Sequence, residues 1–217
     1  MKIINFKSSP ANTPFAPEWN YFLSESNIKD VDFKKLFVFL KKKEKSILKI
    51  KLNKDRTNVD GYTGLGENST TSRYGYYNVF DWKNKELYKL KKNIIKSHKA
   101  YLKYLSLKPG KNIFIACWFN ILKKNQSIGK HLHGVTPDTY LSGNICVNCV
   151  ETSTYYINPV NVLNDPQIYR SKNEVGKLTL FPSNIPHYTD THVGNEDRLT
   201  IGFDLFLISN REQTRRL

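Results

Sequence analysis

The hydrophobic period of this chain changes once, at Pro109-Gly110, and that change limits the folds available to it. Before it, residues 32–48 and 81–107 place apolar side chains at the spacing of an amphipathic helix. After it, short runs alternate with a period of two, which is typical of strands. The runs expected to form strands are residues 113–122, 140–150, 155–157, 176–181, 187–189 and 198–208.

Short strands separated by Gly, Pro and Asn turns predict a β-sandwich or jelly roll. Because the helices come first, we expect them to pack on one outer face of the β core, which makes the fold α+β and mainly β. At 217 residues the chain is most simply one domain. Its expected parts are a polar, proline-containing extended arm over residues 1–30, helical support over residues 31–110 with a strand around residues 47–52, and the β core over residues 111–210.

The composition favours a reducing compartment. No run approaches the ~18 apolar residues of a membrane span, and the N-terminus lacks a signal-peptide pattern, so we expect a cytoplasmic protein without a membrane partner. Cys117, Cys146 and Cys149 are odd in number and lie in apolar strands, which does not suit a disulfide framework. Cys146 and Cys149 should face opposite ways on one strand, which argues against a zinc or redox pair. The oligomeric state stays open.

The net charge of +15 has two interpretations. A strongly basic surface is typical of nucleic-acid-binding proteins. Here the excess is mostly lysine, accompanied by abundant asparagine, and a genome rich in A and T enriches both residues through codon usage alone. We favour codon bias and solvated helix faces, which leaves nucleic acid as a weakly supported partner.

His131 and His133 form a His-x-His pair, and side chains two residues apart on a strand point to the same face. His187 follows a Phe-Pro-Ser turn and can supply the third corner of a metal site. Any one histidine is more often structural than a ligand. The conjunction of the three with a nearby cation and hydroxyl favours metal binding.

That cation and hydroxyl are Arg198 and Thr200, which open the last strand and share one of its faces. They lie within plausible reach of an anion bound at the metal. A buried guanidinium needs such a partner, and the alternative is a structural salt bridge to Asp204 or Glu196. A metal with open positions beside an anion anchor is the outline of an oxygenase that uses iron and a 2-oxo acid.

Residues 60–69 form a long loop that contains Gly61, Gly64 and Gly66. The loop has no lysine where a phosphate-binding loop requires one, which excludes a nucleotide site of that class. We interpret the glycines as ordinary loop geometry, with a lid or rim over a pocket as the alternative.

Several runs resemble the 2-oxoglutarate (2OG)/Fe(II)-dependent oxygenase family of bacteria and phages, in the prolyl 4-hydroxylase-like superfamily. They are His131-Leu132-His133, Leu141-Ser142-Gly143, the run from Gly176 to His187 and the run from Arg198 to Phe203. The resemblance is specific over about residues 118–206 and looser at Thr63-Gly64-Leu65 and Ser72-Arg73-Tyr74. It implies a double-stranded β-helix with helices packed on one sheet.

The resemblance implies an enzyme, a 2OG- and Fe(II)-dependent dioxygenase that hydroxylates a C–H bond and converts 2OG to succinate. Its cofactors would be Fe(II), 2OG as co-substrate and dioxygen. The resemblance alone suggests a peptidyl, prolyl-type substrate, so a protein or peptide partner is favoured. Two alternatives stay open: a cupin-like metal-binding β-barrel without activity, and a nucleic-acid-directed oxygenase. If a phage encodes the protein, it would work in the host cytoplasm.

The same resemblance implies roles for individual residues. The iron ligands would be His131, His133 and His187, and the residues near 2OG would be Arg198 and Thr200 on its far carboxylate, with Asn120, Ser142 and Asn144 nearby. The wider superfamily usually has a carboxylate where this chain has His133, and Asp138 and Asp190 are alternative third ligands. Cys146 stands where prolyl hydroxylases carry a tyrosine near the co-substrate. His192, in a polar loop, is interpreted as a rim or surface residue.

Overall fold

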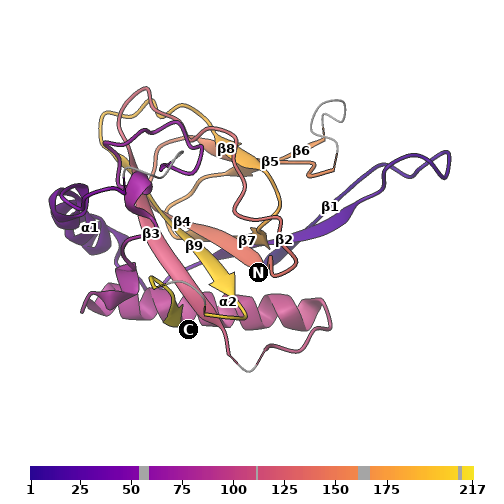
Figure 1. Cartoon of the computed structure of the whole chain (residues 1–217), viewed down its shortest axis with the longest axis horizontal. Coiled ribbons are helices and arrows are strands. Elements are labelled where there is room, and N and C mark those ends of the chain that lie inside the picture. Colours follow the sequence, from indigo (N-terminus) through magenta and orange to yellow (C-terminus); the bar gives the residue numbers. More distant parts are fainter. Residues whose placement is uncertain (54–58, 111, 161–166, 210–211) are drawn as a thin grey trace.

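Two antiparallel β-sheets form the body of the protein (Figure 1). The structure is a computed structural model, and it describes residues 1–53, 59–110, 112–160, 167–209 and 212–217. Within these residues the larger sheet has the strand order β1-β2-β7-β4-β9-β3-β10, and the smaller sheet has the order β6-β5-β8. The elements are β1 (Lys2–Lys7), β2 (Asn20–Asn27), α1 (Phe33–Leu48), the 3₁₀ turns η1 (Thr71–Arg73) and η2 (Val79–Asp81), α2 (Lys85–Tyr104), β3 (Phe114–Leu122), β4 (Leu141–Asn148), β5 (Ser153–Ile157), β6 (Ile168–Lys172), β7 (Lys177–Pro182), β8 (His187–Thr189), β9 (Arg198–Phe206) and β10 (Arg215–Arg216). The predicted mainly β class is confirmed, and every strand predicted after Gly110 is present.

Strand β9 separates an apolar core from a polar interior. Its side chains that join the core on the helix side are Leu199, Ile201, Phe203 and Leu205. Its intervening residues line a cavity on the opposite face, and they are Arg198, Thr200, Gly202 and Asp204. Because β9 pairs with β3 on one side and β4 on the other, three strands present alternate residues to that cavity.

Both predicted helices are present, and they pack on the outer face of the larger sheet (Figure 1). Helix α1 begins after Asp32, whose carboxylate accepts a hydrogen bond from Lys35 N at 3.0 Å. Helix α2 begins later than predicted because the Asn84 side chain accepts two backbone N–H groups of its first turn and so fixes the start at Lys85. No helix in the described ranges is both long and apolar enough to span a membrane.

The N-terminal segment is a β-hairpin rather than the extended arm predicted for residues 1–30. β1 and β2 pair along their whole length, and β2 also pairs with β7. The prediction was wrong because the prolines lie only in the connection between the two strands, which projects from the body in Figure 1. The buried carboxylate of Glu25 anchors the hairpin, since it accepts hydrogen bonds from Tyr169 and Ser171 and pairs with Lys177.

The strand predicted around residues 47–52 is also wrong. Helix α1 continues to Leu48 and buries Ile47, so this residue follows the helical period. Sequence reasoning also missed β6 and β10, which are short and polar. Both lie at the edge of a sheet, where one-sided burial leaves a weak alternation signal.

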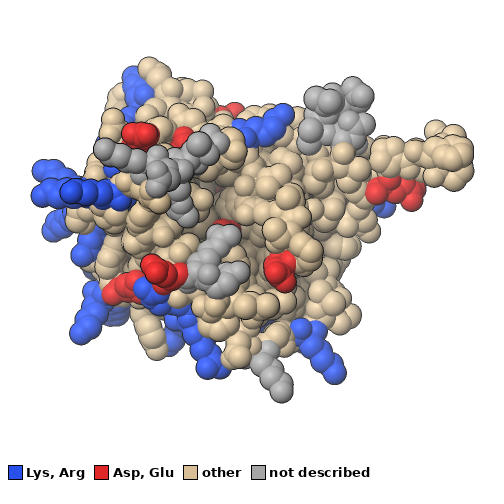
Figure 2. All heavy atoms as spheres, viewed as in Figure 1, with Lys and Arg blue, Asp and Glu red and all other residues tan. Residues whose placement is uncertain are grey.

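Lysine and arginine side chains gather over α1 and along the lower edge of the face shown in Figure 2. The exposed lysines of α1 are Lys34, Lys35, Lys42 and Lys45. They lie away from the residues that the helix buries against the sheet, which is the arrangement of a solvated helix face.

Gly143 of β4 lies directly opposite Phe203 of β9. A β-carbon at position 143 would clash with the Phe203 ring and would lie 2.7 Å from the carbonyl oxygen of Thr179. That carbonyl belongs to strand β7 and cannot move without disturbing the sheet. Gly143 therefore lets β7, β4 and β9 approach one another.

Gly143→Ala should lower the free energy of unfolding by about 1–3 kcal/mol, because the added methyl group overpacks the sheet. Chemical denaturation followed by circular dichroism measures this change. Gly134→Ala is the matched control, since the nearest atom to an added β-carbon there is the Thr139 hydroxyl at 3.3 Å, which can rotate. Equal stability of the two variants would contradict the packing argument.

Candidate metal centre

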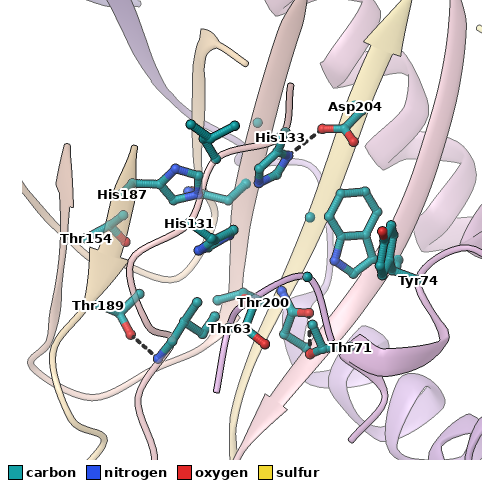
Figure 3. Close-up of a pocket in the computed structure, with 18 of the residues that line it drawn as sticks. Thr63, Thr71, Tyr74, His131, His133, Thr154, His187, Thr189, Thr200 and Asp204 are labelled. Carbon is teal, nitrogen blue, oxygen red and sulfur yellow. Dashed lines mark hydrogen bonds and ion pairs between the residues drawn. The ribbon is translucent and has the colours of Figure 1, made fainter. Parts of the chain in front are cut away.

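A cavity of about 150 Å³ lies against the polar face of β9 (Figure 3). Residues of both sheets line it, together with the loop after residue 59 and the segment before β4. The lining residues from the histidine-bearing segments are Ile128, His131, Leu132, His133 and His187. The cavity is therefore the place where the predicted site residues can meet.

Backbone hydrogen bonds bring the three histidines together. His131 and His187 form an isolated antiparallel bridge, in which each N–H donates to the other's carbonyl at 3.1 and 2.9 Å. The N–H of His133 donates to Ser183 O at 2.9 Å. Residues 131–133 are thus tied to the β7–β8 region without belonging to a longer strand. One ligand atom from each histidine lies within 4.8 Å of the others.

Hydrogen bonds at Nδ1 leave Nε2 free on two of the histidines. His131 Nδ1 lies 2.9 Å from Gly129 O, and His187 Nδ1 lies 3.1 Å from Ile185 O. A carbonyl oxygen only accepts, so Nδ1 carries the hydrogen and Nε2 keeps its lone pair. Burial and the neighbouring histidines lower the pKa of His131 to about 4 and lower the pKa of His187 well below its usual value. Both rings are therefore neutral at pH 7.

His133 is oriented by a carboxylate. Its Nδ1 lies 2.5 Å from Asp204 Oδ1 (Figure 3), and Ser142 Oγ donates to the same oxygen at 2.7 Å. Ser142 Oγ also lies 2.7 Å from Ser183 Oγ. Sequence reasoning considered Asp204 only as a partner for Arg198. Its even spacing from Arg198 along β9 was the available sign that it faces the cavity.

Arg198 is 2% exposed, and its guanidinium is only partly satisfied. Its Nε and Nη1 have no hydrogen-bond partner among the described residues. When the side-chain amide of Asn173 is turned so that its oxygen faces hydrogen-bond donors, that oxygen accepts a hydrogen bond from Arg198 Nη2 at 3.1 Å. Burial lowers the pKa of Arg198, which reflects the cost of holding this charge away from water. Within the described part of the chain, Arg198 forms no ion pair with Asp204 or Glu196.

The other residues predicted near the co-substrate divide into two groups. Thr200, Asn120 and Asn144 line the cavity. Thr71 Oγ1 donates to Asn120 Oδ1 at 2.7 Å, and Asn144 Nδ2 donates to the Tyr156 hydroxyl at 3.1 Å. The fully buried Ser142 is not a lining residue, because its hydroxyl is engaged by the hydrogen bonds just described.

Neither alternative third ligand joins the histidines. Asp138 is exposed, and Asp190 accepts a hydrogen bond from Ser153 N at 2.8 Å. Neither carboxylate lines the cavity. The prediction that His192 is a rim or surface residue was wrong, since this side chain is 1% exposed and its Nε2 lies 2.6 Å from Glu196 O. The polarity of its loop gave no sign of that burial.

The loop of residues 60–69 forms part of the cavity wall. Asp60, Gly61 and Thr63 line the cavity. Gly61, Gly64 and Gly66 have φ values of +65°, +76° and +72°, in the left-handed region that favours glycine. Both interpretations of the loop therefore apply, because its glycines serve backbone geometry and its first residues form a rim.

Tyr74 and Trp118 form an aromatic wall beside His133. The ring centroids of Tyr74 and Trp118 lie 5.6 Å apart, and those of Trp118 and His133 lie 5.7 Å apart. Gly202 makes room for this wall, since a β-carbon there would lie 2.9 Å from the indole. Sequence reasoning did not assign Tyr74 a role, although Tyr74 belongs to a run that carried the family resemblance.

The thiols of Cys146 and Cys149 lie closer together than predicted. The register of β4 against β9 shifts between Cys146 and Asn148, and Cys149 lies beyond the end of β4. The prediction that the two face opposite ways was wrong because this irregularity breaks the strand alternation. The interaction of the two side chains lowers the pKa of Cys146 and raises the pKa of Cys149.

Residues 116–204 match the family model described as "Putative 2OG-Fe(II) oxygenase". The matched segment contains all three histidines, Arg198 and Asp204. This segment of the chain is similar to the 2OG-Fe(II) oxygenases. The similarity supports an enzyme of the dioxygenase class, and the matched family uses Fe(II), 2OG and dioxygen. No curated protein matches the chain in sequence.

Two of the solved structures that resemble this protein share their fold with most of the chain. A prolyl-4-hydroxylase from Pseudomonas putida is 12% identical with a TM-score of 0.54, and the match covers 85% of this chain and 91% of that chain. The viral collagen prolyl hydroxylase vCPH from Paramecium Bursaria Chlorella virus-1, solved as a 2OG complex, is 11% identical with a TM-score of 0.51. That match covers 84% of this chain and 94% of the viral one. The likeness confirms the predicted double-stranded β-helix.

The residues around the cavity fit the cofactors of the matched family. Imidazole nitrogens suit Fe(II), and three protein ligands leave further coordination positions open. The two guanidinium nitrogens of Arg198 that lack a partner among the described residues suit a carboxylate such as that of 2OG. The site therefore offers a metal-binding half and an anion-binding half within one cavity.

Replacing His131, His133 or His187 with alanine should abolish stoichiometric Fe(II) binding, because each change removes one of three converging nitrogen ligands. Anaerobic Fe(II) titration, followed by desalting and metal analysis, measures the bound ion. Near-ultraviolet circular dichroism should stay close to that of the wild type, because the apolar core lies on the other face of the larger sheet.

Two controls separate loss of a ligand from general damage. His98→Ala removes a buried histidine of α2 that bonds Tyr140, and it should leave metal binding intact. Asp138→Ala removes the exposed alternative carboxylate and should also have no effect. Full metal content in His187→Ala, or its loss in Asp138→Ala, would refute the three-histidine assignment.

Proposed function

We propose that this protein hydroxylates a C–H bond of a protein or peptide, of prolyl type, and converts 2OG to succinate and carbon dioxide in the same reaction. The observation that supports this proposal best is the incompletely paired guanidinium of Arg198, which lines the same cavity as three convergent histidines. A structural metal site needs no such anion anchor. A cupin-like β-barrel without activity is therefore the weaker alternative.

The metal-binding half consists of His131, His133 and His187. Each would bind Fe(II) through Nε2, since each Nδ1 is engaged by an oxygen acceptor. Bound iron would supply the activation of dioxygen that is coupled to oxidative decarboxylation of 2OG. The hydrogen bonds at Nδ1 hold the three rings oriented, so that little rearrangement accompanies metal binding.

The anion-binding half consists of Arg198 and Thr200 on β9. Arg198 supplies two buried guanidinium nitrogens that have no partner among the described residues, and Thr200 adds a hydroxyl two residues further along the same face. Together they would bind the far carboxylate of 2OG. Asn120 and Asn144 present amide groups to the same cavity and would contact the co-substrate, whereas Ser142 would support Asp204.

A peptide substrate is favoured because two of the solved structures that share the fold over most of the chain are prolyl hydroxylases. The loop of residues 60–63 and the wall of Tyr74 and Trp118 border the cavity, where a substrate side chain would enter. A nucleic-acid substrate is less favoured, since exposed lysines of α1 form a solvated helix face outside the cavity lining.

Arg198→Met should raise the 2OG concentration needed for half-maximal turnover by about ten-fold or more, because it removes a charge-assisted pair worth ~1.5–3 kcal/mol. Iron affinity should change little. Succinate formation as a function of 2OG concentration measures the 2OG requirement. Anaerobic Fe(II) titration measures the iron affinity.

Two variants sharpen this test. Arg198→Lys keeps the charge but loses the planar donor arrangement, so it should fall between the wild type and Arg198→Met. Arg215→Met removes a cation that pairs with Asp81, and it should leave the 2OG requirement unchanged. If Arg198→Met lowered thermal stability without altering the 2OG requirement, the residue would be structural.

The proposed substrate class is tested by succinate release above the uncoupled rate. Proline-containing peptides should stimulate turnover with addition of one oxygen atom, detected by mass spectrometry. Binding to oligonucleotides should be weak and should collapse between low and physiological salt without sequence preference. Product formed on one oligonucleotide at physiological salt would favour the nucleic-acid-directed oxygenase instead.

A further inference from the structure

We infer that Asp204 is a positioning residue that supplies, through His133, the negative charge that a ligand set of three imidazoles lacks. The inference rests on the proposed function, because it concerns the same metal. It concerns a carboxylate outside the ligand set, which would set both the orientation and the donor strength of one ligand.

The three histidines differ in what their Nδ1 atoms contact. Those of His131 and His187 lie 2.9 and 3.1 Å from backbone carbonyls. His133 Nδ1 lies 2.5 Å from the carboxylate of Asp204. Hydrogen bonds to a charged acceptor are shorter and stronger than those to a neutral one. His133 is therefore the ring whose Nε2 gains the most electron density from its surroundings.

Asp204 is held in place by the sheet. It lies directly opposite Ser142 in the pairing of β9 with β4, and the Ser142 hydroxyl donates to Oδ1 at 2.7 Å. Ser183, whose backbone carbonyl accepts the His133 N–H, lies 2.7 Å from that hydroxyl through its own Oγ. One buried chain of contacts thus fixes both the backbone and the ring of His133.

The carboxylate of Asp204 contacts His133 and makes no ion pair with Arg198, which lies on the same face of β9, in the described part of the chain. Among the ring nitrogens and cations in those ranges, its contact is the hydrogen bond with His133 Nδ1. At 7% exposure, water screens this carboxylate little. Three neutral imidazoles and this carboxylate together carry the net charge of two histidines and one bound carboxylate.

The test measures metal affinity and a ligand-field spectrum, neither of which needs turnover. Co(II) is titrated anaerobically into the wild type, Asp204→Asn and Glu25→Gln, with visible absorption recorded. Asn keeps an oxygen acceptor for His133 Nδ1 but removes the charge. Asp204→Asn should weaken Co(II) binding by about ten-fold to 100-fold and shift the absorption bands, as expected when a partner outside the ligand set is lost.

Glu25→Gln is the matched control, because it neutralises a buried carboxylate of similar exposure that lies outside the cavity lining. It should leave Co(II) affinity and the spectrum unchanged even if it lowers thermal stability. Ser142→Ala is the second variant if Asp204→Asn does not fold. It removes a hydrogen bond to Asp204 and should shift the spectrum in the same direction by a smaller amount.

A double-variant cycle separates charge supply from a general structural role. In the His133→Asp background the carboxylate would be a direct ligand and Asp204 would lose its donor, so Asp204→Asn should weaken Co(II) binding much less than in the wild type. An equal loss in both backgrounds, or wild-type affinity and spectrum in Asp204→Asn, would overturn the inference. A wild type that binds no Co(II) or Fe(II) would instead overturn the proposed function.

Discussion

The alternation of strand β9 between two partner strands is the constraint on which the rest of the structure depends. With β3 on one side and β4 on the other, each residue of β9 is assigned either to the apolar core or to the cavity. A slip of one residue would drive Arg198 into the helix-packed core and turn Leu199 toward the cavity. Both faces therefore specify one register, and the polar site takes its geometry from the packing of the core.

Much of this architecture is predictable because it follows from short-range periodicity. The apolar spacing of α2 and the alternation of β3, β4 and β9 are strong signals, and both depend on neighbours within a few residues. Arg198 and Thr200 could be assigned to one face for the same reason. The grouping of His187 with His131 needed more, because it rested on the conjunction of several polar residues in segments distant in the chain and on the family resemblance.

The features that sequence reasoning missed depend on contacts that periodicity does not encode. Asp204 could be placed on the cavity face, but its choice of His133 over Arg198 depends on where a ring from another segment lies. The burial of His192 depends on packing around a loop that is polar in sequence. The approach of Cys146 and Cys149 depends on one irregularity in β4. The register against β9 shifts after Cys146, so the regular alternation of strand side chains does not extend to Cys149.

The backbone bridge between His131 and His187 has a consequence for how the enzyme survives in the cell. Its two hydrogen bonds join distant parts of the chain, so the complete set of nitrogens exists only after the sheets have assembled. An unfolded chain would offer His131 and His133, which are two residues apart, but would not hold His187 beside them. An ion that binds the folded chain preferentially shifts the folding equilibrium by mass action. The supply of iron would then govern the lifetime of the protein as well as its rate of turnover. Molecules without iron would unfold more often and would be degraded by proteases sooner than those that hold it.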